Sequence, residues 1–392
     1  MTTPERSGPL AGLLVADFSR ILAGPYASML LADLGAEVVK VESPGGDDTR
    51  SWVPPVRTDA TGTTVGTYYL GVNRNKRSIA LDLKNPDDVA VGQRLAARAD
   101  VMLENFRPGG LAKYGLDYDS VAATNPGIVY ASISGFGSSA EGAKLPGYDL
   151  IVQAISGLMS LTGSPDGAPY RAGISVFDVM AGMHATIGAL AALEKRHETG
   201  RGQHVEVNLM ASALSGMVNQ TSAYVAGGTV PHRMGNSHPS LFPYEPLPCR
   251  DKDLIVTAGN DGQFRKLVEV LGVPGLADDE RFARNEARNA HRDELRPLLV
   301  ERLATRSADD WFTDIIAAGV PCGPINSVDA GVAFATSVGL DPVVEVGEGE
   351  AMVPSVRHPI RFSETPPDYV LPPPGLDQHG AEIRAWLEED SP

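Results

Sequence analysis

Short apolar runs alternate with helix-length segments along the first half of the chain. Apolar runs at residues 13–18 and 37–42 flank a segment, 25–34, that begins with proline in its first turn and stops at Gly35. Proline is favoured in the first turn of a helix, and glycine just past its end. The pattern therefore predicts a strand, a helix and a second strand, in the order of a β-α-β unit.

The alternation continues beyond this unit. Apolar runs at residues 78–83, 101–104 and 128–132 are separated by segments of helical length, such as 87–99. Strands that alternate with helices are typical of a parallel sheet covered on both faces, so a Rossmann-like organisation is expected. The dinucleotide fingerprint G-x-G-x-x-G is missing after the first predicted strand, which disfavours nicotinamide chemistry. A phosphate could still bind at a helix N-terminus there.

The second half of the chain begins with the same pattern and then changes. A helical run at 179–197 is followed by glycines 200 and 202, a strand at 204–209 and a helix that ends near Gly227. Residues 229–248 are rich in Pro, His, Asn and Ser and have little periodicity, which predicts a connector. A smaller domain is then expected from about Leu254, with a strand and helices at 254–257, 264–271 and 292–303.

These observations predict an α/β protein with two domains of unequal size. A chain of 392 residues exceeds the length at which one hydrophobic core stops growing. The proline and glycine residues of 319–324 mark a return from the smaller domain, and the proline-rich tail 366–375 is expected to be extended. We predict a Rossmann-like large domain with a parallel sheet over 1–228, a smaller α/β domain with its connector over 229–320, and a returning segment over 321–392.

Charge and composition restrict the partners of this protein. Lys and Arg total 33 against 49 Asp and Glu, a formal net charge of -16, which argues against binding nucleic acid or an anionic membrane. An anionic ligand would need a local cationic site. The two cysteines, Cys249 and Cys322, are too few for a disulfide framework and favour a reducing compartment. The histidines show no metal-ligand spacing, so no metal is expected.

The start of the sequence is polar. Residues 1–9 have no apolar core like that of a signal peptide, and no later stretch has the uninterrupted apolar length needed to cross a bilayer. We therefore expect a cytoplasmic protein.

Asp178 is the strongest catalytic candidate. It stands directly before a helix whose apolar positions repeat at helical spacing, so the pattern places it at the N-cap, a position that Asp favours for structural reasons alone. Beside the small residues Ala181 and Gly182, backbone N–H groups could also stabilise an oxyanion. A carboxylate there can attack a thioester, giving a mixed anhydride and a thiolate. Return of the thiolate to the aspartyl carbonyl would then give an enzyme-bound thioester.

Several stretches together carry a resemblance to a known family. They lie at residues 17–25, 34–44, 73–78, 99–109, 147–149 and 177–203, with weaker matches at 259–264, 319–324 and 376–379. In these stretches the chain resembles the class III CoA-transferases, of the formyl-CoA transferase and carnitine CoA-transferase type. The resemblance implies an acyl-CoA:carboxylate CoA-transferase in which Asp178 forms an aspartyl-CoA thioester by way of mixed anhydrides.

The resemblance also implies where coenzyme A binds. CoA and acyl-CoA would be substrates on the large domain, with no permanently bound cofactor. Arg107 and Lys113 would supply cations for its phosphates, and Phe106 could cover the adenine. Ser43 and Ser134 stand where some members carry basic residues. The implied CoA contacts are Arg20, Ile21, Ala23, Leu81, Lys84, Asn105, Phe106, Arg107, Lys113, Tyr114 and Phe136.

Two further segments have alternative roles. The basic run 74–77 could bind phosphate or frame the strand that follows it, and we favour framing. Residues 259–263 align with a glycine-rich loop that covers the catalytic aspartate in some members, which suggests a lid. The resemblance further implies a homodimer in which the two chains interlock like linked rings, with the connector 229–248 and the return 319–324 as the crossings between the domains.

Two other functions are alternatives to CoA transfer. An α-methylacyl-CoA racemase resembles the same regions but needs a second acid or base, a histidine where this chain has Tyr148, and a tyrosine titrates too far from neutral pH for that role. A non-catalytic acyl-CoA binding protein would have no need of Asp178 in its small-residue setting. The sequence does not select the acceptor, which we expect to be a small organic acid.

Overall fold

The computed structural model describes residues 7–58 and 62–389, which divide into two compact units. Unit 1 contains the described residues up to Leu158, with Arg171–Thr229 and the described residues from Asp341 onward. Unit 2 contains Met159–Tyr170 and Val230–Leu340. The first boundary lies beside the one expected from sequence, but the second lies later in the chain.

The return to unit 1 begins at Asp341 and not at residue 321. Strand β11 (Cys322–Pro324) pairs with β10 (Asp253–Thr257) of unit 2. The ring of Phe334, on α14 (Val328–Ser337), lies 6.3 Å from that of Phe312. These contacts attach residues 321–340 to the smaller unit, and Met159–Tyr170 joins it as well.

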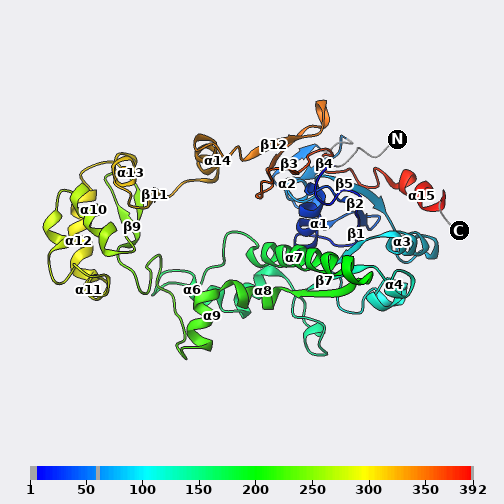
Figure 1. The fold of residues 1–392 in the computed structure, drawn as a ribbon, viewed down its shortest axis with the longest axis horizontal. Coiled ribbons are helices and arrows are strands. Elements are labelled where there is room, and N and C mark those ends of the chain that lie inside the picture. The colour runs from blue at the N-terminus through cyan, green and yellow to red at the C-terminus, as the bar shows by residue number, and fades with distance from the viewer. Residues whose placement is uncertain (1–6, 59–61, 390–392) are drawn as a thin grey trace. The chain divides into compact units, whose positions relative to one another are not determined.

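Unit 1 is built on a six-stranded, all-parallel sheet, which confirms the expected α/β class (Figure 1). The strand order is β5-β2-β1-β6-β7-β8. The strand bounds are β1 Leu14–Asp17, β2 Glu37–Glu42, β5 Lys76–Ala80, β6 Val101–Glu104, β7 Val129–Ser134 and β8 Gln203–Asn208.

Two layers of helices cover the two faces of this sheet. Alternate strand residues enter different cores: Val15 packs with α1 and α7, whereas its neighbour Ala16 packs with α3, α4 and α15. Such alternation is expected of strands buried on both faces. The helix bounds are α1 Ala23–Asp33, α7 Val176–Thr199, α3 Pro86–Arg98, α4 Tyr118–Thr124 and α15 Gly380–Glu389.

Helix α7 packs closely against the sheet and against α1. Its buried positions are mostly small, including Ala181, Ala185 and Ala189, and a Cβ added at Gly182 would lie 2.6 Å from the carbonyl oxygen of Ala23. Within residues 7–58 and 62–389 it is the one helix long and apolar enough to cross a membrane by length and composition, a length that the sequence analysis did not expect. Its packing makes it a core helix of unit 1.

The remaining elements of unit 1 are short. They are β3 Val56–Thr58, β4 Thr64–Gly66, α2 Thr67–Leu70, α5 Asp149–Ile155, α8 Leu209–Gly216, α9 Val218–Val225, β12 Val343–Val346 and β13 Val353–Val356. Helix α6 (Leu158–Leu161) begins at the end of the first segment of unit 1. The proline-rich tail 366–375 has no helix or strand, as expected for an extended segment.

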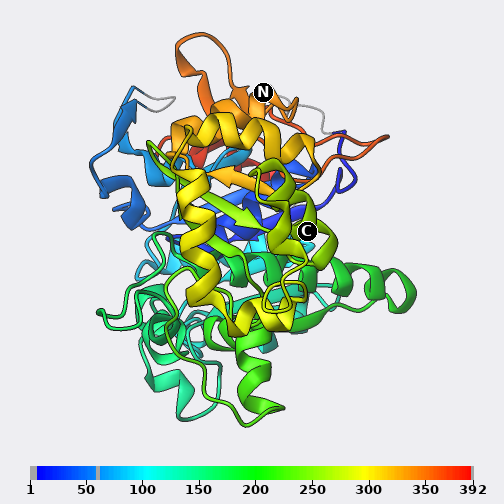
Figure 2. The same ribbon diagram turned by 90° about the vertical axis from the view of Figure 1, so that its left-hand side faces the viewer.

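Unit 2 has its own sheet, which Figure 2 shows together with the helices of this unit, and its own hydrophobic core. Strand β9 (Tyr244–Pro248) pairs with β10, which pairs with β11, and both pairings are antiparallel. Phe264, Leu299 and Trp311, from three different helices, meet in the core. The helices of this unit not yet given are α10 Asp261–Val270, α11 Asn285–Ala290, α12 Arg292–Leu303 and α13 Ala308–Ala317.

Candidate active site

Asp178 lies in the first turn of α7, and Ser175 is the N-cap residue. The helix begins at Val176, earlier than the hydrophobic pattern indicated, because Val176 and Phe177 pack against the same core as the rest of the helix. The prediction that Asp178 caps this helix is therefore wrong. Its carboxylate does not have a capping role to fulfil.

A second carboxylate occupies the backbone donors of this turn. Asp149 Oδ1 accepts hydrogen bonds from the backbone N–H of Phe177 at 2.8 Å and of Asp178 at 3.3 Å. The next N–H, of Val179, donates to the carbonyl of Ser175 at 3.2 Å. N–H groups beside Asp178 were expected to be available for an oxyanion, but the N–H groups of Phe177, Asp178 and Val179 all have acceptors within the protein.

The environment of Asp178 disfavours its charged form. Burial, together with the negative charge of Asp149, raises the pKa of Asp178 from 3.8 to about 7. Tyr68, on α2, has its own pKa raised by burial, and the negative charge of Asp178 contributes to this rise. A carboxylate with a pKa near neutrality is basic enough to be a good nucleophile and is still substantially ionised at pH 7.

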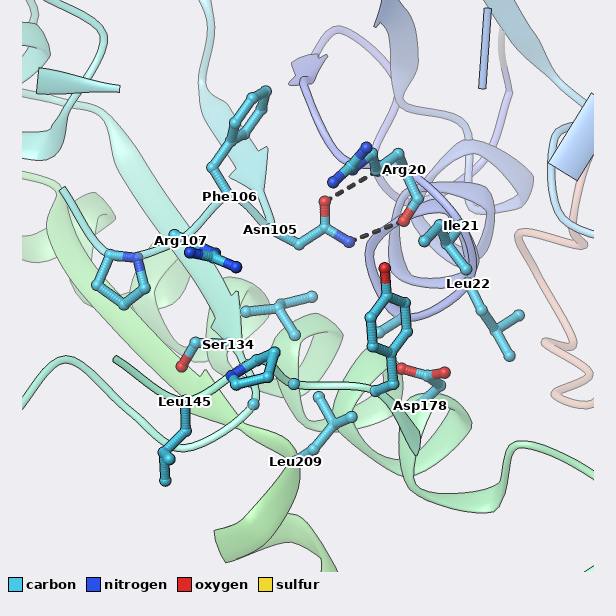
Figure 3. Close-up of a pocket in the computed structure, with 17 residues that line it drawn as sticks. Arg20, Ile21, Leu22, Asn105, Phe106, Arg107, Ser134, Leu145, Asp178 and Leu209 are labelled. Atoms are coloured by element: carbon cyan, nitrogen blue, oxygen red, sulfur yellow. Dashed lines mark hydrogen bonds between the residues drawn. The ribbon is translucent and has the colours of Figure 1, made fainter. Parts of the chain in front are cut away.

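Asp178 opens onto a cavity of about 190 Å³ within unit 1 (Figure 3). The lining comes from loops at the carboxyl ends of β1, β6 and β7, with α5 and α7 beside them. The residues are Arg20, Ile21, Leu22, Ala23, Asn105, Phe106, Arg107, Pro108, Ile133, Ser134, Gly135, Leu145, Pro146, Gly147, Tyr148, Asp178 and Leu209.

The cavity lies at the point where the strand order of the sheet reverses. From β1, the chain proceeds to β2 and β5 on one side, and β6, β7 and β8 lie on the other. Open parallel sheets bind ligands at the carboxyl ends of the strands that flank such a point. Here Arg20 follows β1 and Asn105 follows β6. Asn105 bridges the two loops by accepting from the N–H of Arg20 at 3.0 Å and donating to its carbonyl at 2.7 Å (Figure 3).

A buried ionic cluster holds the loop that carries Arg20 and Ile21. Ile21 has a φ of 71°, a left-handed conformation that is strained for a β-branched residue. Its N–H donates to Asp47 Oδ2 at 3.1 Å. Lys40 Nζ donates to the same oxygen at 2.9 Å and to the carbonyl of Ser19 at 3.1 Å. The side chains of Lys40 and Asp47 are fully buried, so this strained loop is fixed from beneath.

The basic run 74–77 is engaged with protein groups. Arg74 pairs with Asp33, Lys76 with Asp17, and Arg77 with Glu37. All four side chains of the run are buried, and burial lowers the pKa of Lys76 to about 8 despite the charge of Asp17. These contacts support the framing role over direct phosphate binding.

The structure brings together some of the residues implied for CoA and not others. Arg20, Ile21, Ala23, Asn105, Phe106 and Arg107 line the cavity together with Asp178. Leu81, Lys84, Lys113, Tyr114 and Phe136 do not line it. The expected strand at residues 78–83 ends at Ala80 instead, because the chain turns toward α3 there, and the role of these five residues in CoA binding stays a prediction.

The outlying residues have other contacts in the structure. Leu81 is buried in the core beneath α3, whereas Lys84 is exposed in the turn before that helix. Lys113 lies over the ring of Tyr114, 4.7 Å from its centroid. Phe136 packs against the core shared by α1 and α7.

Sequence reasoning missed one wall of the cavity. Leu145, Pro146 and Leu209 line it and belong to loops or helix starts with no charge or motif. Gly147 and Tyr148 were recognised as part of a matching stretch, but only as the place where a racemase would have its histidine. No local pattern could have located the missed residues, because long-range packing places them there.

A smaller cavity of about 110 Å³ adjoins the other side of the Phe106–Pro108 loop. Burial raises the pKa of Glu104 in it to about 7. Ser132 Oγ lies 2.9 Å from His204 Nε2, and the imidazole of His204 stacks on the ring of Tyr118 with the ring centres 5.0 Å apart.

Within the described part of the chain, no group of three or more His, Cys, Asp or Glu residues is placed to hold a metal ion.

The segment expected to act as a lid lies in unit 2. Asn260 caps α10 by accepting from the N–H of Gln263 at 2.9 Å, so residues 259–263 form a loop and the first turn of this helix. Their role over the nucleophile stays a prediction.

Comparisons with known proteins agree along nearly the whole chain. The model of CoA-transferase family III matches residues 10–380. The succinate–glutarate CoA-transferase of Agrobacterium fabrum is 44% identical over 389 residues, which are 98% of this chain and 97% of that protein. The acetyl-CoA:oxalate CoA-transferase of Acetobacter aceti is 38% identical over 98% of this chain and 97% of its own length.

The fold is also shared with a solved structure. A CAIB/BAIF family protein from Brucella suis superposes with a TM-score of 0.88 at 43% identity, covering 97% of this chain and 100% of that one. The sequence match and the fold thus point to the same group of enzymes. This chain belongs to CoA-transferase family III.

Proposed function

We propose that this CoA-transferase carries CoA from an acyl-CoA donor to a small carboxylic acid by way of Asp178. One observation carries the proposal: among the described residues that line the cavity at the switch point, Asp178 is the only carboxylate, and its pKa is about 7. A ligand that binds at the carboxyl ends of the strands would lie beside this carboxylate, which could then attack it.

Each bond change in this scheme is balanced. The Asp178 carboxylate attacks the thioester carbonyl, forming a mixed anhydride and releasing the CoA thiolate. The thiolate attacks the aspartyl carbonyl and expels the donor acid, which keeps one oxygen that came from Asp178. The acceptor carboxylate then attacks the aspartyl-CoA thioester, and the thiolate returns to the acceptor's carbonyl. This last step releases acceptor-CoA and restores Asp178 with one oxygen from the acceptor.

The cavity offers cations for part of the CoA molecule. Arg20 and Arg107 line it, and both side chains are exposed at its rim. Guanidinium groups bind phosphate oxygens through charge-assisted hydrogen bonds, which suits an acidic protein that must hold a polyanion. CoA is longer than the cavity, so its nucleotide end would lie outside on the surface of unit 1.

Relatives suggest the class of acid. The similar proteins named above transfer CoA to glutarate, succinate or oxalate, all small dicarboxylic acids. We infer that the acceptor of this enzyme is also a small dicarboxylate. A screen of acceptor acids against succinyl-CoA and acetyl-CoA, read by mass spectrometry of the CoA products, tests this inference, and turnover of monocarboxylates alone would contradict it.

Covalent trapping tests the role of Asp178. The enzyme is incubated with acyl-CoA and treated with hydroxylamine or borohydride, and the modified peptide is sequenced. We expect label on Asp178 in the wild type and none in Asp178→Asn. With an acceptor that carries ¹⁸O in its carboxylate, one labelled oxygen should appear in Asp178 after turnover. Wild-type transfer rates in Asp178→Asn or Asp178→Ala would refute the mechanism.

We also propose that the enzyme is a homodimer with interlocked chains. The support is the family membership together with the long connector that begins near Thr229 and the return at Asp341, which let the chain leave unit 1 and come back to it. An interlocked dimer cannot dissociate without unfolding, so it should persist on dilution. Mass photometry at nanomolar concentration should show only dimers, and a folded monomer that binds CoA would exclude this arrangement.

A further inference from the structure

The helix that carries Asp178 has its first turn occupied by another acid, Asp149. We propose that Asp149 is a positioning residue for Asp178: it takes the amide N–H groups of the first turn of α7 and places a second negative charge beside the nucleophile. This inference rests on the proposed function, in which Asp178 attacks the thioester.

The contacts of Asp149 fix both the backbone and the direction of its carboxylate. Oδ1 accepts from Phe177 at 2.8 Å and from Asp178 at 3.3 Å, while Oδ2 accepts from Gln153 Nε2 at 2.5 Å. Gln153 is itself held, because its Oε1 accepts from the N–H of Ala172 at 2.8 Å. Asp149 is 6% exposed and Gln153 is fully buried. The acid is thus held on both sides and has little freedom to move.

The start of α5 is also fixed by close packing. A Cβ added at Gly147 would lie 2.3 Å from the Cα of Gly135, so the two glycines are in direct backbone contact. This contact sets the chain that leads into α5, where Tyr148 lines the cavity and Asp149 is buried beneath it. Tyr148 therefore contacts the cavity, and its neighbour Asp149 contacts the helix that carries Asp178.

This arrangement changes what a helix N-terminus does to a carboxylate. Unpaired N–H groups and the helix dipole stabilise the ionised form and make it a weaker base. Because Asp149 accepts from these N–H groups and adds a like charge, the N-terminus of α7 cannot lower the basicity of Asp178 in this way. The nucleophile keeps the high pKa that its burial gives it.

Other groups also face Asp178 and must be counted. The cavity is also lined by Arg20, Arg107 and Tyr148, but the pKa of Asp178 is set by burial and by Asp149 and not by these residues; Arg20 pairs with Asp48 at 3.3 Å. Tyr68, on α2, is close enough for its pKa to respond to the charges of Asp178, Asp149 and Asp47. Burial raises the pKa of Asp178 the most, and the negative charge of Asp149 makes the next largest contribution.

Variants of the full-length enzyme separate the charge of Asp149 from its geometry. Asp149→Asn removes the charge but keeps an oxygen acceptor for the two N–H groups. Asp149→Glu keeps the charge but displaces the acceptor. Asp149→Asn with Gln153→Glu reverses the hydrogen bond between the two side chains and moves the charge off the acceptor of the α7 amides, with loss of the Gln153 bond to the carbonyl of Ile174. Asp251→Asn is the control, because Asp251 likewise accepts from a first-turn N–H, of Ala308 on α13, with no nucleophile nearby.

The measurement is the rate of formation of the Asp178–CoA adduct against pH, followed by mass spectrometry in single turnovers. On the acid side of the pH–rate profile, the rate should fall to half near pH 7 in the wild type and in Asp149→Glu. In Asp149→Asn and in the double variant, this midpoint of the acid limb should lie lower by roughly one pH unit. kcat should fall by about ten- to a hundredfold in each Asp149 variant: in Asp149→Glu because the nucleophile is displaced, and in Asp149→Asn and the double variant because a less basic Asp178 is a weaker nucleophile. The KM for acyl-CoA should stay within about threefold, since Asp149 does not line the cavity.

The outcomes distinguish this inference from the proposed function. If no adduct forms on Asp178 in the wild type, the proposed function itself is wrong. If the adduct forms but the acid limb of Asp149→Asn stays where it was, Asp149 has only a structural role and the inference is wrong. The inference is equally wrong if neither Asp149→Asn nor the double variant folds, or if Asp251→Asn shifts the limb as much as Asp149→Asn does.

Discussion

The carboxylate of Asp178 is costly for the folded protein to ionise. Its pKa of about 7, raised by burial and by Asp149, means that the folded state binds this proton more tightly than the unfolded state, in which the pKa is 3.8. The wild type therefore gains stability as the pH falls from about 8 to about 4, and loses it as the pH rises through 7. The folded protein thus loses part of its stability above pH 7 by holding this carboxylate in a buried position.

Asp178→Asn should therefore stabilise the protein at high pH while abolishing transfer. Because the variant has no charge to bury, we expect its free energy of unfolding at pH 8 to exceed that of the wild type by about 2–4 kcal/mol. The difference should shrink as the pH is lowered to 5. Chemical denaturation at both pH values measures it, with the exposed Asp166→Asn as a control that should show no such trend. Equal stability of Asp178→Asn and the wild type at pH 8 would contradict this account.

At this scale the sequence pointed to Asp178, the nucleophile that we propose, but not to the acid that contacts its turn of helix. Asp178 was identified from its place before an amphipathic helix and from the family resemblance. Asp149 acts on it across 29 positions of the chain. No pattern in the sequence says that α5 and α7 meet at their N-termini, because this meeting depends on how both helices pack on the sheet.

At the scale of single elements, the loop after β1 depends on a cluster of buried charges. Lys40, in the middle of β2, is fully buried and contacts Asp47 and the carbonyl of Ser19. Burial alone would lower the pKa of Lys40, but the neighbouring carboxylates of Asp47, Asp17 and Glu42 raise it. Lys40 is thus charged, and the carboxylates around it depend on its charge.

Lys40→Met should destabilise unit 1 strongly. The substitution preserves much of the side-chain volume but leaves Asp47 buried without its ammonium partner, which typically costs about 3–5 kcal/mol. Urea denaturation followed by tryptophan fluorescence measures the loss. Lys195→Met is a matched control, because Lys195 makes a surface pair with Glu198 that should contribute less than about 1 kcal/mol. Similar losses in the two variants would show that the buried cluster does not hold this loop.

The sequence predicted β2 itself but gave no reason for a lysine in it. The apolar run 37–42 predicted the strand, and the resemblance over 34–44 assigned no role to Lys40. A charged residue among valines is usually read as the exposed face of a strand, whereas here both faces of β2 are covered by helices. The partners of Lys40 lie in the loops after β1 and β2, and only the folded sheet brings these loops together.

At the scale of the whole molecule, the end of the chain completes unit 1. Helix α15 buries Ile383 and Leu387 against α3, and the extended tail before it runs along the segment around Asn75. The sequence predicted a returning segment and an extended tail. It placed the start of the return too early, because residues 321–340 contain a strand and a helix whose partners in unit 2 are distant in sequence.

Asn75 is one of the residues that hold this tail on unit 1, together with Arg50 and Tyr69, which donate to the carbonyl of Pro374. Its Oδ1 accepts from the N–H of Val370 at 2.8 Å and of Leu371 at 3.1 Å, and its own N–H donates to the carbonyl of Leu371 at 2.7 Å. The φ of Asn75 is 62°, so Asn75→Gly keeps the backbone relaxed and removes only the side chain.

We expect the amides of Val370 and Leu371 to exchange with deuterium at least about tenfold faster in Asn75→Gly than in the wild type. Each lost acceptor is worth about 1 kcal/mol, and 1.4 kcal/mol corresponds to a factor of ten in the opening equilibrium. Amides of α12, which lie in the separate core of unit 2, should exchange at the wild-type rate and serve as the internal reference. Asn75→Ala should show the same loss of protection plus a lower melting temperature, because alanine is strained at a positive φ. Unchanged protection of both tail amides in Asn75→Gly would mean that the other contacts of the tail, such as those of Arg50 and Tyr69 with the carbonyl of Pro374, hold it without Asn75.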